Sequence, residues 1–490
     1  MIADCRCATA PVAPSSVEAC QSVTINTNMR SLVFGVCLLL APVPLAAQTG
    51  SRTALPPGSP FLGGIPSGTP TSEPLQLSLR DAVQRALEHN LATIVAEERS
   101  ASAEGARTHA FGDLLPDVRG SVSEARRTTN LEAFGFPLMP GFPRVVGPFN
   151  VFDARIFASQ AVIDLRASNG VRAAEHELVA TRHDYRDSRD LVALVAGNLY
   201  LQAVTANARA ESVRAQRETA EALYRQAVNL RQSGLVAGID VVRAEVRLST
   251  ERQRATAADN EFQKAKLQLA RAIGLPPRQE FVLTDTVPYS PAPVITLEAA
   301  LERAYRQRPD YLAIVERAEA ADATRRSVAG ELLPSVRVNG DYGAIGLTAT
   351  TALPTFNVAG TVNVPLFEGG RVRGRLAQAE SDLRLRRAEA ENARAGIYYE
   401  VQTAFLDLQA SEEELKTATR GRELADQQLT QSRDRFAAGV ASNIEVVQAQ
   451  EAVALSSEQY IGALFRFNVA KTMLTRSIGA IEDAIKQESR

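Results

Sequence analysis

The side chains that could act in catalysis or bind a metal are few in this chain and lie far apart. Its four histidines are His89, His109, His176 and His183. His176 and His183 are two helical turns apart, about 10.5 Å along an α-helix, which is too far for one metal ion. The sequence contains neither a Gly-rich phosphate-binding loop nor a Gly-x-Ser-x-Gly turn that would expose a nucleophilic serine. These patterns predict that the chain is not an enzyme and that it binds neither a metal nor a cofactor.

The N-terminus has the features of a secretory signal peptide. Met29 and the positively charged Arg30 precede an apolar run over 32–41, and the small residues Ala46-Ala47 follow. A charged start, a short apolar core and a small-residue cleavage site are typical of exported proteins. We therefore interpret residues 1–47 as an N-terminal extension and signal peptide with Met29 as the true start. The alternative is that residues 1–28 are a genuine extension.

Cysteine content and charge exclude several other classes of protein. The four cysteines are Cys5, Cys7, Cys20 and Cys37. A chain cleaved after Ala47 would have no thiol, and therefore neither a disulfide nor a cysteine metal site. The 490 residues are 45% hydrophobic and 22% charged, with a net charge of -2. This is an ordinary globular composition without a basic excess, so we expect no nucleic acid partner.

The second half of the chain repeats the first. Leu114-Leu115-Pro116 returns as Leu332-Leu333-Pro334, 218 residues later, and Ile239-Asp240-Val241-Val242 returns as Ile444-Glu445-Val446-Val447, 205 residues later. Because the offset drops between these two pairs, a loop of variable length must separate two conserved parts of each copy. Two copies of about 200 residues indicate a duplicated domain rather than a short-period solenoid.

The distribution of prolines predicts very long helices. No proline lies between Pro148 and Pro276 or after Pro365, and a proline inside a helix costs roughly 3 kcal/mol or more. In the first of these stretches apolar or small residues recur every seven positions, which is typical of helices packed along their length. These residues are Val171, Leu178, Tyr185, Val192, Leu199, Ala206 and Val213. Glycines near 234–238 and 439 mark the turn of a helical hairpin in each copy.

Short segments with alternating polar and apolar residues predict two strands in each copy. In 355–366, for example, Val358, Val362 and Val364 alternate with Asn357, Thr361 and Asn363. Strands of this length with one apolar face suit an outer-membrane barrel, which needs at least eight of them. Four strands cannot close a barrel, and an open edge in lipid leaves backbone groups unpaired. If these strands sit in a membrane, several chains must therefore share one barrel, and the sequence alone leaves open whether two or three do so.

The whole pattern resembles the TolC-type outer membrane efflux proteins, over residues from about 76 to 480. The resemblance depends on the repeat, on Leu-Leu-Pro before each first strand, on Val364-Pro365-Leu366-Phe367-Glu368-Gly369-Gly370, and on the glycine-containing turn that leads into Ile444-Glu445-Val446-Val447. It implies a mainly α fold with a membrane β-barrel, in which a duplicated helix–strand–strand–long helix–helix unit forms a trimeric 12-stranded barrel and an α-helical barrel.

The expected domains follow from this assignment. Residues 48–75 form a Pro/Gly-rich linker, 76–290 the first repeat and 291–490 the second. The first repeat has strands at about 115–127 and 149–163 and a long hairpin over 166–274. The second has strands at about 333–346 and 355–366 and a hairpin over 369–478.

The resemblance also implies a function and partners. It implies a channel of a tripartite efflux or type I secretion system in the outer membrane, extending into the periplasm. The partners would be two further copies of the chain, outer membrane lipid, a periplasmic adaptor and an inner-membrane pump. A periplasmic adaptor or a structural coiled-coil protein, which also uses long hairpins, is the alternative.

Two groups of residues near the hairpin turns are the candidate sites. Glu445 and Asp240 follow the turns, and under three-fold symmetry one of them would ring a tunnel mouth with carboxylates, which favours cations. The alternative for each is an acidic residue placed at a helix N-terminus by the helix dipole. The residues expected to contact the adaptor are small or apolar, apart from one asparagine: Gly234, Leu235, Val236, Gly238, Gly439, Val440, Ser442 and Asn443.

Overall fold

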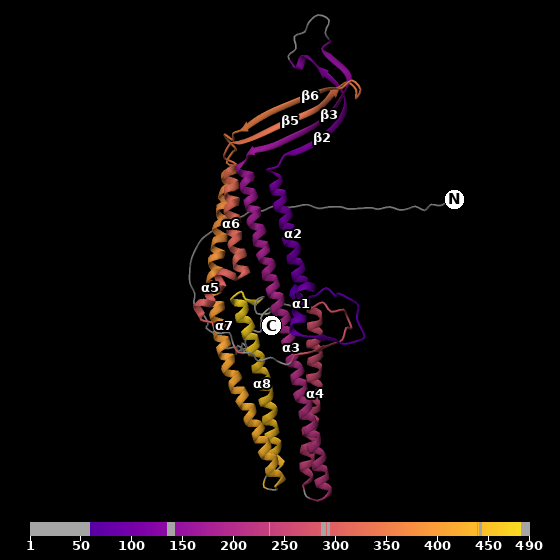
Figure 1. Ribbon diagram of the computed structural model, residues 1–490, viewed down its shortest axis with the longest axis vertical. Coiled ribbons are helices and arrows are strands. Elements are labelled where there is room, and N and C mark those ends of the chain that lie inside the picture. The colour runs from indigo at the N-terminus through magenta and orange to yellow at the C-terminus, as the bar shows by residue number, and fades with distance from the viewer. Residues whose placement is uncertain are drawn as a thin grey trace, which may run out of the picture. The chain divides into compact units, whose positions relative to one another are not determined.

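The two halves of the chain contain the same series of elements, two short helices, two strands and two long helices (Figure 1). The computed structural model describes residues 59–134, 143–234, 236–285, 291, 295–438, 440 and 443–481. The expected extension and signal peptide lie outside these residues. Leu55–Arg490 form one compact unit, and every element below belongs to it.

The first strand of the chain is short and lies beside the fourth strand. The elements of the first half are β1 Leu75–Leu77, α1 Leu79–His89, α2 Leu91–Gly112, β2 Asp117–Asn130, β3 Val145–Ile163, α3 Leu165–Gln232, α4 Gly238–Ala272 and β4 Phe281–Leu283. Those of the second half are α5 Leu297–Gln307, α6 Pro309–Gly330, β5 Ser335–Gly346, β6 Leu353–Asn363, α7 Arg371–Ala437 and α8 Asn443–Ser477. β1 and β4 pair in parallel, and two 3-10 turns, Pro60–Leu62 and Glu132–Phe134, complete the described elements.

Side-chain hydrogen bonds cap the first turns of α1 and α5. The side chain of Ser78 accepts a hydrogen bond from the Asp81 amide at 3.2 Å, and the Ser78 amide donates to Asp81 Oδ2 at 3.3 Å. This capping box satisfies two amides that a helix N-terminus leaves without partners. Thr296 accepts from the amide of Ala299 at the same place in the second half. Helix α4, in contrast, begins after Ala237, without a side-chain cap.

The seven-residue stripe of α3 lies against its neighbours. Val171, Leu178 and Val192 are buried, and the other four members are half-buried. α3 packs against α2, α4 and α6, and α7 packs along α8. Among the described helices α3 alone is long and apolar enough to cross a membrane, but half of its most apolar stretch is buried inside the protein. Packing in the protein interior therefore accounts for the apolar character of that stretch.

Each half has a hydrophobic core where its short helices meet its long hairpin. The first is centred on Tyr200 and Leu269, and the second on Phe467 and Val401. The core residues are mainly alanine, leucine and valine, and the small side chains of the many alanines let long helices approach closely. The two cores fix the hairpins to the short helices that lead to the strands.

Two sequence predictions are wrong in detail. The part of the 48–75 linker that the structure describes is docked, because the Gly64 amide donates to the Arg271 carbonyl at 2.8 Å and Phe61 packs on the first core. A Cβ at Gly64 would lie 2.4 Å from the Gly274 nitrogen, so this contact needs glycine. The connection between the strands expected at about 115–127 and 149–163 is also shorter, since β2 continues to Asn130 and β3 begins at Val145. These extra residues pair across the hairpin, which satisfies their backbone groups.

Candidate functional site

The four long strands form one antiparallel sheet in the order β2-β3-β5-β6. Asp117 pairs with Ser159, Ser159 with Asn339, and Asn339 with Ala359, so the register can be followed across the whole sheet. β2 and β6 each pair with one strand within the described part of the chain and therefore have one free edge. A free strand edge exposes a row of amide and carbonyl groups that another chain can pair with.

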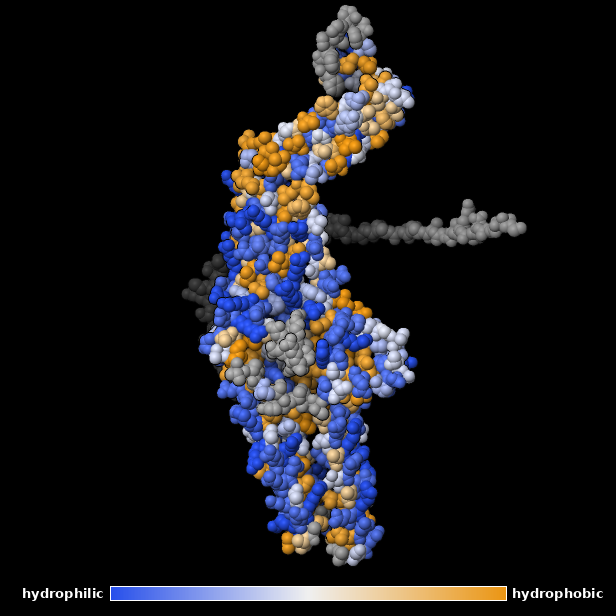
Figure 2. Space-filling model, viewed as in Figure 1, coloured by the Kyte–Doolittle hydropathy of each residue, from blue (hydrophilic) through white to orange (hydrophobic). Residues whose placement is uncertain are grey.

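One face of this sheet is apolar and exposed. In Figure 2 hydrophobic side chains are prominent over the strands. The exposed apolar residues on this face are Val118, Val122, Ile156, Tyr342, Val338, Phe356, Val358 and Val362. The register places Val122 beside Ala154, Ile156 beside Tyr342, and Tyr342 beside Phe356, so they form a continuous surface. Such a surface is stable in hydrocarbon and unfavourable in water.

The opposite face carries most of the charged side chains of the sheet. Arg155 Nε lies 2.8 Å from Asp153 Oδ1, and Arg155 Nη1 lies 3.3 Å from Asp341 Oδ1. Arg119 Nε lies 3.2 Å from Asp117 Oδ2 on the edge strand β2. In an outer-membrane barrel the apolar face meets lipid and the polar face lines the lumen. In a closed barrel this ion-paired face would therefore lie on the inside.

Arg155 of β3 packs closely against β5 because its partner in that strand, Gly343, has no side chain. A Cβ on Gly343 would lie 2.1 Å from the Ala154 carbonyl oxygen and 2.7 Å from Arg155 Cγ. Any other residue at position 343 would push the two strands apart or displace the arginine.

The first hairpin tip joins α3 to α4. Gly234 has φ of 73°, a left-handed conformation that favours glycine after a helix end. Gly238, the first residue of α4, is close to the Arg231 side chain, and Val236 is half-buried. Asp240 Oδ1 lies 3.4 Å from Arg243 Nη1 one turn further on. Leu235 lies outside the described residues.

The second tip joins α7 to α8 and contains an ion pair across the turn. Arg435 Nε lies 3.1 Å from Glu445 Oε1, and the Glu445 side chain is 39% exposed. Val440 is exposed. Gly439 and Ser442 lie outside the described residues, and Asn443 begins α8. Sequence reasoning found Glu445 but missed its partner Arg435.

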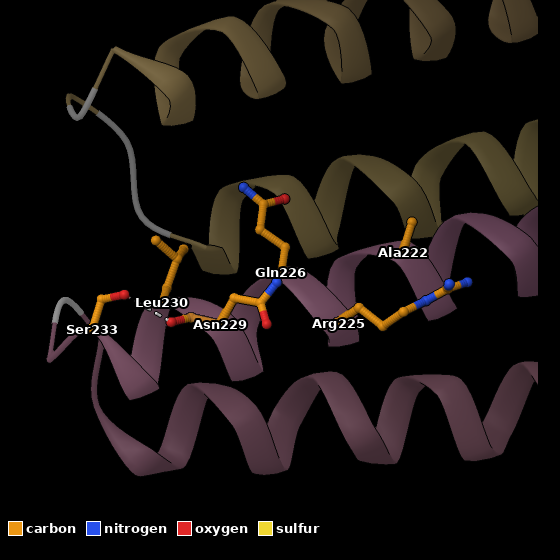
Figure 3. A pocket seen from close by; sticks show the side chains of 6 residues that line it. All are labelled: Ala222, Arg225, Gln226, Asn229, Leu230 and Ser233. Atoms are coloured by element: carbon orange, nitrogen blue, oxygen red, sulfur yellow. Dashed lines mark hydrogen bonds between the residues drawn. The ribbon is translucent and has the colours of Figure 1, made fainter.

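Two hollows lie near the tips. One, about 540 Å³, is lined by six residues from the last turns of α3 and the residue after them, Ala222, Arg225, Gln226, Asn229, Leu230 and Ser233 (Figure 3). The other, about 200 Å³, lies between the two hairpins and is lined by residues of both, including Arg247 and Arg433. Arg247 Nη2 contacts the fully buried Glu251 at 3.0 Å. Sequence reasoning missed this pair, because neither residue stands out in a run of polar residues.

A second charged cluster connects the two halves of the chain. Arg308 is almost fully buried and donates to both oxygens of Asp310 and to Glu400. Arg476 of α8 is ion-paired with Asp187 of α3. Burial raises the pKa of Asp187 to about 6, and the nearby Asp310 and Asp184 add to this effect against the attraction of Arg476 and Arg308. Burial alone would raise the pKa of Asp310, but the hydrogen bonds and charge of Arg308 hold it below its usual value.

His176 and His183 are partly buried in the helix packing. His176 Nδ1 lies 2.8 Å from Glu316 Oε2, and burial lowers the pKa of His183. No group of three or more potential metal ligands occurs among the described residues.

Comparisons with known proteins agree with this geometry. A family model described as "Outer membrane efflux protein" matches residues 82–275 and 300–480. The chain is 23% identical over 386 residues to the pyoverdine export outer membrane protein OpmQ of Pseudomonas putida, a match that covers 76% of this chain and 78% of that protein. It is 25% identical to the outer membrane protein OprJ of Pseudomonas aeruginosa over 43% of each chain.

Solved structures share the fold. The Campylobacter jejuni outer membrane channel CmeC superposes with a TM-score of 0.71 at 18% identity, and the match covers 90% of this chain and 98% of that one. The outer membrane protein VceC of Vibrio cholerae gives a TM-score of 0.69 at 18% identity, covering 82% of this chain and 96% of that one. The two matched segments, the duplicated strand pairs and the long hairpins lead to one assignment: the chain belongs to the outer membrane efflux protein family.

Proposed function

We propose that this chain is the outer membrane channel of a tripartite efflux system, a passive duct through which cargo delivered by a pump leaves the cell. The observation that supports this most strongly is the four-stranded sheet with one apolar exposed face, one ion-paired polar face and two free edges. Three copies joined edge to edge would supply twelve strands and enclose a lumen. Channels of this family are trimeric and work with an adaptor and a pump.

The rival interpretation as a periplasmic adaptor or structural coiled-coil protein does not explain the sheet. Neither role places Phe356 and Val358 in water on an edge strand, where they are 78% and 71% exposed. Large exposed apolar surfaces mark sites that contact lipid or another protein. Family membership also favours the channel.

We further propose that the hairpin tips contact the adaptor. Gly234, Val236, Gly238 and Val440 present small or apolar surface there, and an incoming helical hairpin could approach closely over it. We assign Leu235, Gly439, Ser442 and Asn443 to the same contact on their position in the sequence alone. The hollow beside Leu230, at the end of α3, is next to the first tip and would widen this surface.

Glu445 and Asp240 are proposed to line the mouth of the tunnel. Arg435 and Arg243 contact them, so each carboxylate is partly neutralised in this structure. Separation of the Glu445–Arg435 pair would expose the carboxylate and strengthen the cation preference of the mouth.

Fractionation and planar-bilayer recording test these proposals. The channel should appear as heat-modifiable, detergent-dependent trimers in the outer membrane, whereas a soluble periplasmic pool would support the rival. In a salt gradient, Glu445→Lys should shift the reversal potential toward anions. Glu413→Lys, at an exposed carboxylate of α7 more than 20 residues before its end, is the matched control and should leave it unchanged. An unaltered reversal potential for Glu445→Lys would remove Glu445 from the mouth but not the channel assignment.

A further inference from the structure

The polar face of the sheet has more arginines than its carboxylates can neutralise. Its charged residues are Asp117, Arg119, Arg127, Asp153, Arg155, Arg337 and Asp341, as the strand register places them. All three carboxylates on this face are ion-paired, Asp117 with Arg119, and Asp153 and Asp341 with Arg155. The paired groups sum to one negative charge per chain.

Two arginines remain outside these pairs. No ion pair or hydrogen bond within the described part of the chain reaches the side chain of Arg127 or Arg337, and both residues are exposed. Their two positive charges exceed the single negative charge of the paired groups, so the face is net positive. Three chains would triple that excess around one lumen.

The negative charge of Asp341 is also less accessible to solutes than the positive charges of the two unpaired arginines. The Asp341 side chain is 14% exposed and is ion-paired with Arg155. A solute that passes through the barrel therefore has little contact with this carboxylate. Arg337 lies in register with Ala161 and Thr361 on the neighbouring strands, and the side chains of these two residues are small and uncharged. An unpaired guanidinium in such surroundings attracts carboxylate, sulfate and phosphate groups and can hold them with two hydrogen bonds.

We propose that the barrel of this channel favours anionic cargo, with Arg337 and Arg127 as the residues that determine this preference. The inference rests on the proposed channel function, because only a closed barrel makes the polar face a lumen. It concerns the barrel wall and is independent of the carboxylates at the hairpin tips.

A cysteine probe beside Arg337 tests the proposal in the full-length protein in whole cells. Thr361 is exposed and is the direct register partner of Arg337, so Thr361→Cys reports the potential at that point. Its reaction rates with an anionic and a cationic methanethiosulfonate reagent, added from outside, are compared. Reagents reach the barrel from the cell exterior without crossing the tips, and the chain without the added cysteine serves as blank.

We expect Arg337→Gln to lower the anionic-to-cationic rate ratio at Thr361→Cys by about threefold, since one charge roughly 7 Å away acts oppositely on the two reagents in partly screened water. Arg337→Lys should keep the ratio, which separates charge from a structural role. Arg126→Gln, on the other face of β2, is the matched control and should not change it.

Two outcomes separate the inference from the channel assignment. If Thr361→Cys reacts but Arg337→Gln leaves the rate ratio unchanged, the anionic preference is wrong and the channel stands. This result is also expected if Arg337 instead binds lipid phosphates. If Thr361→Cys is unreactive while Val358→Cys on the apolar face reacts, the lumen assignment itself fails.

Discussion

Arg476, in the last turn of α8, forms an ion pair with Asp187 in α3, so the end of the second repeat is attached to the first. Asp187 also faces Arg308 and Asp310 from α6 and its surroundings, and Asp184 from its own helix. The attachment between the repeats is therefore a network of alternating charges, most of it shielded from water.

The Asp187 network should give the protein a specific pH dependence. The pKa of Asp187 is about 6 in the folded protein and 3.8 in its reference state, so the folded state binds more protons between these values. The contribution of Asp187 to stability therefore rises as the pH falls from 7 toward 4, by up to roughly 3 kcal/mol.

Asp187→Asn removes this titration and keeps the shape of the side chain. The melting temperature of the wild-type trimer, relative to that of Asp187→Asn, should increase between pH 7 and pH 5. A relative melting temperature that falls over this range would show that the Arg476 ion pair outweighs burial.

Removal of the Arg308 side chain should be costly. Arg308→Met would leave Asp310 and Glu400 without their cation, and loss of one partner from a buried ion pair costs about 3–5 kcal/mol. We expect a fall of several degrees in the melting temperature of the trimer. Arg306→Met, at an exposed arginine in the preceding helix, should change it little. Equal effects of the two substitutions would contradict the structural role of Arg308.

Gly343→Ala should impair formation of the barrel. Its Cβ would lie 2.1 Å from the Ala154 carbonyl oxygen, so β3 and β5 would have to separate. Gly340→Ala on the same strand is the matched control, because its Cβ would meet its closest neighbour, the Asn357 carbonyl oxygen, at an ordinary 3.6 Å. The yield of heat-resistant trimers in the outer membrane is the measurement. Similar yields for both variants would show that the strands adapt at Gly343.

Tyr200→Phe should destabilise the first core by about 1–2 kcal/mol. The Tyr200 hydroxyl donates to Asp285 Oδ2 at 2.8 Å, and burial together with this hydrogen bond raises the pKa of Tyr200 well above its ordinary value. Tyr305→Phe, whose hydroxyl has a longer, exposed hydrogen bond to the Arg394 carbonyl, is the control. Thermal unfolding of the two variants should separate them, and identical midpoints would show that the Asp285 contact contributes nothing.

The sequence by itself determined the repeat, the long hairpins and the existence of amphipathic strands. These features depend on local rules: proline is excluded from helix interiors, Ser78 caps a helix, and alternation at Asn357 to Asn363 gives a strand two faces. Each rule involves residues close together in the chain, so one sequence is enough to apply it.

Only the tertiary structure decided which charges meet. Arg155 reaches Asp341, Arg476 reaches Asp187, and Glu445 reaches Arg435, and in the first two cases well over a hundred residues separate the partners. The strand register and the packing of helices from both repeats bring these groups together. No local pattern encodes such distances, because each partner taken alone looks like an ordinary solvated charge. The same packing docks the proline-rich segment near Gly64, whose composition alone suggested a free linker.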